Sequence, residues 1–165
     1  MKLKSNELLK KIIEESSNDH KHNILLDLEN GEKLFNKSII SIFDTYILKD
    51  SDEQISIEIA KNNFDRLIKM NGDKTGYESS NNEIRIIDYV EKTNMTASEQ
   101  WLIGLVVMNN LINKINFPEK FIFYFSYDDE LLTIRFHKFR KEEGLWFNGD
   151  IENCEFPIGY FYNID

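Results

Sequence analysis

The chain has 165 residues, a formal net charge of −9 and 41% hydrophobic residues. This length fits one domain spanning residues 1–165 that buries roughly 70% of its unfolded surface, and the hydrophobic content excludes a disordered acidic tail. The acidic excess argues against nucleic-acid binding, which needs a basic surface, and suits a basic protein partner, whose approach it would accelerate.

Cysteine content and hydropathy predict a cytoplasmic protein. The single cysteine, Cys154, excludes an intramolecular disulfide and with it a disulfide-built secreted fold. Charged residues interrupt the apolar residues near the N-terminus, so no signal peptide is expected. The longest apolar run, Trp101–Met108, is far shorter than the ~20 residues of a membrane-spanning helix.

The first fifty residues mix helical and strand-like patterns. Leucines and isoleucines at helical spacing predict a helix from about Asn6 to Ser16. Asn30-Gly31 predicts a two-residue hairpin turn, because both residues tolerate a positive φ. The run Ile39–Leu48 fits either a buried helix or a strand, and its periodicity does not decide between them.

Between residues 55 and 82 we expect a strand, a helix and a loop. Isoleucine at every second position over Ile55–Ile59 predicts a half-buried strand. Helical spacing returns over Phe64–Ile68, and Asn71-Gly72 is expected to end that helix, since glycine readily adopts the left-handed conformation. The polar segment Asp73–Asn82 predicts a loop.

After a strand predicted over Glu83–Val90, a capping box opens a further helix. In Thr96-x-x-Glu99 the hydroxyl serves an unpaired backbone N–H, and the carboxylate reaches back to the cap. An apolar stripe, widened by Leu102 and Val106, predicts that this helix lies at the centre of the core. The stripe consists of Trp101, Leu105, Met108, Ile112 and Ile115. Pro118 is expected to close the helix.

Two strands, Phe121–Tyr127 and Leu131–Phe139, are predicted to form a hairpin across the acidic turn residues 128–130. Helices and strands alternate along the chain without a regular βαβ rhythm. The sequence therefore predicts an α+β fold, in which an antiparallel sheet packs against a few helices.

Motifs that would indicate catalysis or cofactor binding are absent from the sequence. There is no glycine-rich phosphate loop, no GxSxG, no HExxH and no CxxC. His20 and His22 lack further ligands in register, so no metal site is expected. Cys154 stands next to Glu155, which would raise the pKa of the thiol rather than activate it, and a packing role is expected. We expect no catalytic residues and no cofactor.

Arg135 and His137 offer the best enzymatic arrangement in the sequence. They share one face of the predicted strand, where a base and a phosphate-binding cation would serve a small RNA- or nucleotide-processing enzyme. The alternative is a solvent-facing strand surface with charged side chains in cross-strand pairs, and we favour this alternative.

Aromatic and acidic residues crowd the C-terminal third, a combination that suits contact with a basic partner. Phe156 and Phe161 are expected to complete the core, whereas Tyr160 and Tyr162 are expected to form an exposed pair. The predicted partner-binding residues are Asp128, Asp129, Glu130, Trp146, Asp150, Glu152, Glu155, Tyr160 and Tyr162.

The same region resembles the C-terminal pattern of bacterial immunity proteins from polymorphic-toxin loci, including contact-dependent growth inhibition systems. The resemblance covers about a third of the chain, and a looser similarity extends over Tyr77–Trp101. The segments that carry it are Leu132–Arg140, Glu142 or Glu143, Leu145–Phe147, Asp150–Glu152 and Pro157–Tyr160.

This resemblance implies a small cytoplasmic protein that binds and neutralises the toxic C-terminal domain of a cognate toxin. Many such toxins are basic nucleases, which agrees with the acidic charge of this chain. The rival functions are the RNA- or nucleotide-processing enzyme and an adaptor for an unrelated host protein.

Overall fold

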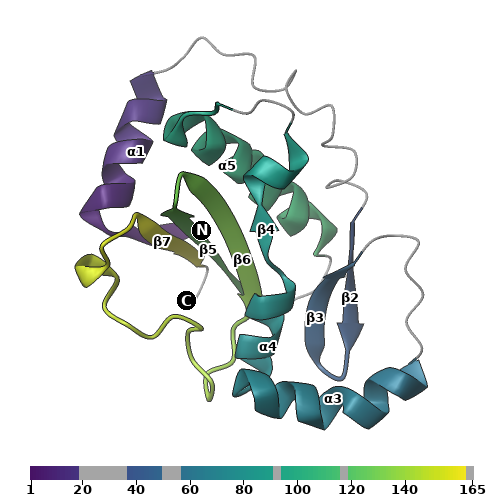
Figure 1. The fold of residues 1–165 in the computed structure, drawn as a ribbon. Helices are drawn as coiled ribbons and strands as arrows, with labels where there is room; N and C mark the ends of the chain where they lie inside the picture. The colour runs from purple at the N-terminus through teal and green to yellow at the C-terminus, as the bar shows by residue number, and fades with distance from the viewer. Residues whose placement is uncertain (19–36, 50–56, 91–93, 116–118, 163–165) are drawn as a thin grey trace.

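The computed structural model describes residues 1–18, 37–49, 57–90, 94–115 and 119–162 (Figure 1). The helices are α1 (Glu7–Asn18), α3 (Ile57–Asn71), α4 (Lys74–Asn81) and α5 (Ala97–Lys114), with short 3-10 helices η2 (Ile86–Tyr89) and η3 (Ile151–Asn153). The strands are β1 (Lys2–Ser5), β2 (Ser38–Ile42), β3 (Thr45–Lys49), β4 (Ile84–Arg85), β5 (Phe121–Asp128), β6 (Leu131–Lys138) and β7 (Ile158–Tyr162). None of the helices in these ranges is long and apolar enough to cross a membrane.

Five strands form an antiparallel sheet in the order β1-β7-β5-β6-β4, and β2 and β3 form a separate hairpin. The α+β prediction is therefore confirmed. Figure 1 shows α1 and α5 on one side of the sheet and the segment between β6 and β7 looping along the other. Both faces of the sheet are thus covered.

Strand β5 supplies side chains to both faces by simple alternation. Phe121, Phe123 and Phe125 join the larger hydrophobic cluster beneath α5, whereas Ile122 and Tyr124 join a second cluster on the opposite face. The second cluster includes buried residues of η3 and β7 and is completed by half-buried side chains from the segment between β6 and β7. An antiparallel sheet often leaves one face to water, but this one buries both.

The capping box of α5 is confirmed: Thr96 and Glu99 bond reciprocally at the N-terminus of the helix. The predicted stripe is partly wrong. Leu105 and Ile112 are only half-buried, and the face in contact with the sheet instead includes Gly104, Val107 and Leu111. At Gly104 a Cβ atom would lie 2.8 Å from Leu132 Cδ2, so the missing side chain lets the helix approach the sheet closely.

The ambiguous run Ile39–Leu48 forms neither one helix nor one strand but the β2–β3 hairpin. Phe43 and Asp44, with φ angles of 50° and 61°, make its two-residue turn. A second turn of this kind joins β5 to β6 through Asp129 and Glu130, with φ angles of 47° and 63°. The predicted β5–β6 hairpin is therefore confirmed.

Three predictions in the middle of the chain need correction. The half-buried strand expected over Ile55–Ile59 is wrong, because α3 already begins at Ile57. The loop expected over residues 73–82 is wrong, because this segment forms α4. Only residues 84–85 of the strand expected over residues 83–90 are extended in a sheet, and η2 follows.

Other predictions of this region are confirmed or fall outside the structure. Helix α3 ends at Asn71, and Gly72 follows it with a φ of 88°, as the Asn71-Gly72 pair predicted. The Asn30-Gly31 turn, the His20 and His22 pair and Pro118 lie outside the described residues.

Candidate functional site

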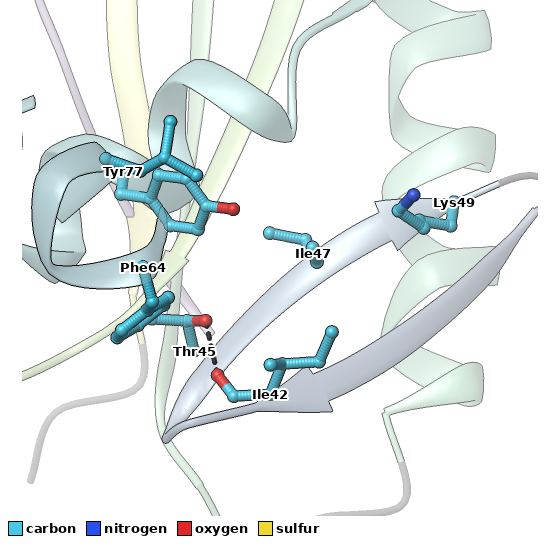
Figure 2. A pocket seen from close by; sticks show the side chains of 7 residues that line it. Ile42, Thr45, Ile47, Lys49, Phe64 and Tyr77 are labelled. Atoms are coloured by element: carbon cyan, nitrogen blue, oxygen red, sulfur yellow. Dashed lines mark hydrogen bonds between the residues drawn. The ribbon is translucent and has the colours of Figure 1, made fainter. Parts of the chain in front are cut away.

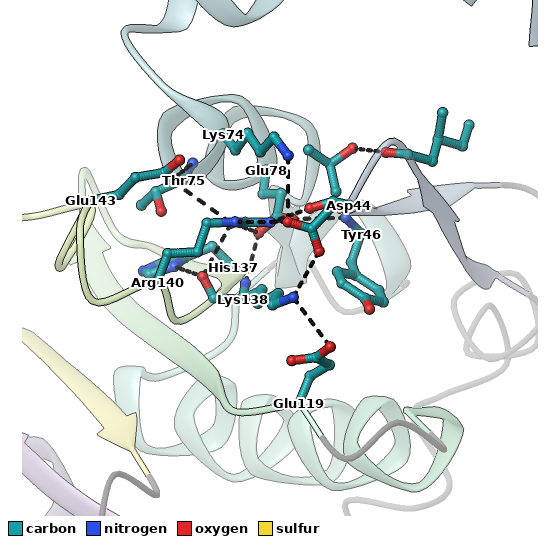
Figure 3. Close-up of polar contacts among 12 residues, drawn as sticks. Asp44, Tyr46, Lys74, Thr75, Glu78, Glu119, His137, Lys138, Arg140 and Glu143 are labelled. Atoms are coloured by element: carbon teal, nitrogen blue, oxygen red, sulfur yellow. Dashed lines mark hydrogen bonds and ion pairs between the residues drawn. The ribbon is translucent and has the colours of Figure 1, made fainter.

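A buried ion pair between Glu78 of α4 and Arg140 lies where α4 meets the edges of β3 and β6 (Figure 3). Oε1 of Glu78 accepts from Arg140 Nη2 at 2.7 Å and from Tyr46 N at 2.8 Å. Oε2 accepts from Lys138 N at 2.7 Å and from Arg140 Nη1 at 3.1 Å. Four donors therefore occupy this carboxylate, which leaves no position from which it could take a substrate proton.

Asn82, four residues after Glu78, also bonds to both β3 and β6. Its amide accepts from Leu48 N at 2.7 Å and donates to Tyr46 O at 2.8 Å and Phe136 O at 3.0 Å. Glu78 and Asn82 thus bond to outward-facing backbone groups of β3 on one side and β6 on the other. The side chains of Glu78 in α4 and of Asn82, the C-cap residue of α4, take the place that a strand would occupy between the two sheets.

Around the ion pair, a rim of charged residues is tied to the turn of the β2–β3 hairpin. Asp44 Oδ1 accepts from Lys138 Nζ at 2.7 Å, and Asp44 Oδ2 lies 3.4 Å from Lys74 Nζ (Figure 3). The bond with Lys138, helped by Lys74, lowers the pKa of Asp44. Burial raises the pKa of Glu78, and the bonds from Arg140 oppose that effect. These contacts hold the hairpin against the main sheet.

The sequence did not predict this cluster. Glu78 and Arg140 are 62 residues apart, and no spacing links them. A signal for α4 was nevertheless present: Asp73 is a favoured N-cap residue, and its side chain accepts from Gly76 N at 2.7 Å.

His137 is buried, with none of its surface exposed, so the expectation of a solvent-facing strand surface is wrong here. Its Nδ1 lies 2.8 Å from Lys138 O, which accepts, and its Nε2 accepts from Trp146 N at 3.4 Å. Burial lowers the pKa of His137 to about 4. The ring is therefore a neutral packing group at neutral pH, stacked on Tyr124.

Arg135, on the same strand face, is engaged by other side chains. It forms an ion pair with Glu83 and lies over the ring of Trp146, 5.2 Å from its centroid. We favoured a cross-strand charge pair for Arg135. The ion pair with Glu83 is of this type, although Glu83 lies just before β4 rather than within it.

A small apolar pocket of about 120 Å³ separates the β2–β3 hairpin from α3 and α4 (Figure 2). Ile42, Ile47, Phe64 and Leu67 line it, and Figure 2 shows the Tyr77 hydroxyl directed toward the hairpin. Burial raises the pKa of Tyr77. A space of this size accommodates about one apolar side chain, and Thr45, Lys49 and Tyr77 are the polar residues in its lining.

The predicted partner-binding residues lie in more than one place. Asp128, Asp129 and Glu130 are exposed at the β5–β6 turn. Glu152 and Glu155 are exposed in the segment before β7. These two acidic groups occupy different segments, before β6 and before β7.

Asp150 and Trp146 belong to the second of these segments but also support its structure. Asp150 is exposed, and its carboxylate accepts from Glu152 N at 3.1 Å and from Asn153 Nδ2 at 2.9 Å. Trp146 is 37% exposed and packs edge-to-face on Tyr124. Changing either residue would therefore disturb local packing as well as any contact with a partner.

The exposed tyrosine pair is a correction. Tyr160 is only 8% exposed and Tyr162 is half-buried, because both rings pack in the second hydrophobic cluster. Phe156 and Phe161 pack against the hydrophobic clusters, as expected. Cys154 is half-buried against the second cluster, in agreement with a packing role. Among the described residues, no three His, Cys, Asp or Glu side chains converge to hold a metal ion.

The sequence model of the uncharacterized protein PM0498 family matches residues 4–164. The chain belongs to this family. No curated protein and no solved structure gave a match. The matched range includes the Glu78–Arg140 ion pair and both acidic segments.

Proposed function

We propose that this protein is a cytoplasmic immunity protein, which binds the toxic C-terminal domain of a cognate bacterial toxin and neutralises it. The proposed toxin domain is basic, as a nuclease would be. The inhibitor would act by occupying the toxin surface and would need no chemistry of its own.

The observation that carries this proposal is the state of His137. A rival enzyme would use His137 as its base, yet the ring is fully buried, its pKa is lowered to about 4 and both nitrogens contact backbone groups. Arg135, the other residue of the rival site, is held by Glu83. By contrast, the acids of the β5–β6 turn and the segment before β7 are exposed, and the chain carries a net charge of −9.

The test is co-expression in a bacterial host with the C-terminal domain of a large secreted protein encoded directly upstream of this gene. We expect the toxin domain alone to arrest growth and this protein to restore it. The purified pair should bind with a Kd at or below about 1 nM, which corresponds to about 12 kcal/mol. Association should slow as salt rises from ~0.01 M to ~1 M, because the Debye length falls from about 30 Å to about 3 Å.

Glu152→Lys with Glu155→Lys should lower the association rate, since both carboxylates are exposed. Asp65→Lys with Glu142→Lys, which reverses two exposed charges elsewhere, is the matched control for the change in net charge. Failure to bind such a domain would contradict the proposal. Hydrolysis of RNA or nucleotides by the purified protein, abolished by Arg135→Ala or His137→Ala, would establish the rival enzyme instead.

A further inference from the structure

A hollow of about 450 Å³ opens between the β5–β6 turn and the start of α5. Its apolar walls are Ile87, Met95, Tyr127 and Leu131, and the acids Asp129 and Glu130 stand in its lining. The volume lies within the range of about 300–1,000 Å³ that is typical of ligand sites. The hollow therefore combines apolar walls with negative charge.

Gln100 holds the two sides of the hollow in place. Its Oε1 accepts from Leu132 N at 2.8 Å, and its Nε2 donates to Glu130 O at 2.9 Å. The side chain is buried and uses both ends of its amide, so the turn is fixed against the first turn of α5. A shape fixed before binding reduces the ordering cost of binding.

The two carboxylates are free to meet a cation. Asp129 and Glu130 are exposed and form no ion pair or side-chain hydrogen bond with the described residues. Burial raises the pKa of Tyr127, and the charge of Glu130 raises it further, which indicates that the negative potential reaches the tyrosine in the wall.

The positive N-terminus of α5 does not offer an open anion site that would offset the negative charge of Asp129 and Glu130. Thr96 Oγ1 accepts from Glu99 N at 3.2 Å, and Glu99 Oε2 accepts from Thr96 N at 2.8 Å. The capping box thus places another carboxylate at the positive end of the helix dipole. The hollow favours a cation over an anion.

We propose that this hollow receives an arginine or lysine side chain of a protein partner. The aliphatic stem would pack on Met95, Tyr127 and Leu131, as long basic side chains do on apolar surface. The charged end would lie between Asp129 and Glu130, with charge-assisted hydrogen bonds to both. The identity of the partner rests on the proposed function, whereas the chemistry of the hollow does not.

The first experiment needs no toxin. The isotopically labelled protein is titrated with N-acetyl-arginine amide, and in parallel with N-acetyl-citrulline amide, which has nearly the same shape but no charge. We expect saturable NMR shifts at the Gln100 side-chain amide and at the Tyr127 and Leu131 backbone amides. The arginine probe should bind at least about fivefold more tightly than the citrulline probe.

The variant Asp129→Asn with Glu130→Gln should weaken arginine binding at least about fivefold, and asparagine tolerates the left-handed turn position. The matched control is Asp65→Asn with Glu142→Gln, which removes the same two charges from exposed positions outside the hollow and should bind as the unaltered protein does. Equal binding of both probes, shifts elsewhere on the protein, or equal weakening by both double variants would overturn the inference.

A second experiment repeats the comparison with the toxin domain of the co-expression test. Asp129→Asn with Glu130→Gln should raise the Kd about tenfold or more relative to the control variant. If arginine binds the hollow but no toxin is neutralised, the proposed function is wrong, and the inference that the hollow binds a basic side chain is retained. If the toxin is neutralised equally by both double variants, the hollow is not its contact.

Discussion

His137 should make the stability of this protein depend on pH between about 6.5 and about 4. Burial lowers the pKa of His137 from 6.5 to about 4 in the folded state. Between these two pH values the unfolded chain binds a proton at His137 and the folded chain does not. The contribution of His137 to the free energy of unfolding is therefore fully present above about pH 6.5 and is lost as the pH decreases. A proton on Nε2 would also face the N–H of Trp146, which now donates to that nitrogen from 3.4 Å.

The magnitude follows from the difference between the two pKa values. A pKa difference of one unit corresponds to 1.36 kcal/mol, so the full difference corresponds to about 3 kcal/mol of unfolding free energy. About 2 kcal/mol of this should be lost by about pH 5. The measurement is urea unfolding of the unaltered protein and of His137→Gln from about pH 7 to about pH 5. Glutamine cannot titrate, so the stability gap between the two proteins should narrow by about 2 kcal/mol at the acidic end.

The comparison isolates His137, because His20, His22 and every carboxylate are present in both proteins. A gap that stays constant with pH would refute the reasoning, since it would show that the folded protein accepts the proton as easily as the unfolded chain. His137→Phe provides a second non-titrating variant, which should narrow the gap in the same way if glutamine perturbs the packing against Tyr124.

Two further predictions concern the core and the buried ion pair. Trp101 is 3% exposed and packs on Phe125 and Phe161, so Trp101→Ala should cost about 3–5 kcal/mol of unfolding free energy, and half-buried Leu105→Ala should cost less. Arg140→Ala should cost about 3–5 kcal/mol, because it leaves the Glu78 carboxylate buried without its counter-charge. Lys74→Ala, which removes a partly exposed ion pair with Asp44, should cost at most about 1 kcal/mol in the same assay.

Local signals in the sequence predicted the parts of the fold that local contacts determine. The capping box at Thr96, the alternation along β6 and the Asn71-Gly72 helix end each depend on residues within a few positions of one another. Helix α4 has eight residues and buries Thr75, Glu78 and Ser79 rather than an apolar stripe. Its place is determined by bonds to residues 32–68 positions away, which hydrophobic periodicity does not report.

The predicted partner-binding surface also depends on contacts between distant segments, which local sequence patterns do not report. Alternation correctly placed Tyr160 and Tyr162 on one face of β7, but it carries no information on whether a later or earlier segment covers that face. The segment between β6 and β7 does so without regular secondary structure over most of its length, through residues such as Leu145, Phe147 and Ile151. The β5–β6 turn was predicted more successfully, because three consecutive acids between two alternating strands specify an exposed position directly.

Glu78 of α4 and its C-cap residue Asn82 cover two strand edges that would otherwise be open to pairing with another chain. Strand edges with outward-facing N–H and C=O groups are templates on which other chains add strands and aggregate. Tyr46, Leu48, Phe136 and Lys138 would present such groups on β3 and β6, but Glu78 and Asn82 already bond to them. A substitution at either residue would therefore expose two strand edges at once, and aggregation of the folded protein would accompany the loss of stability.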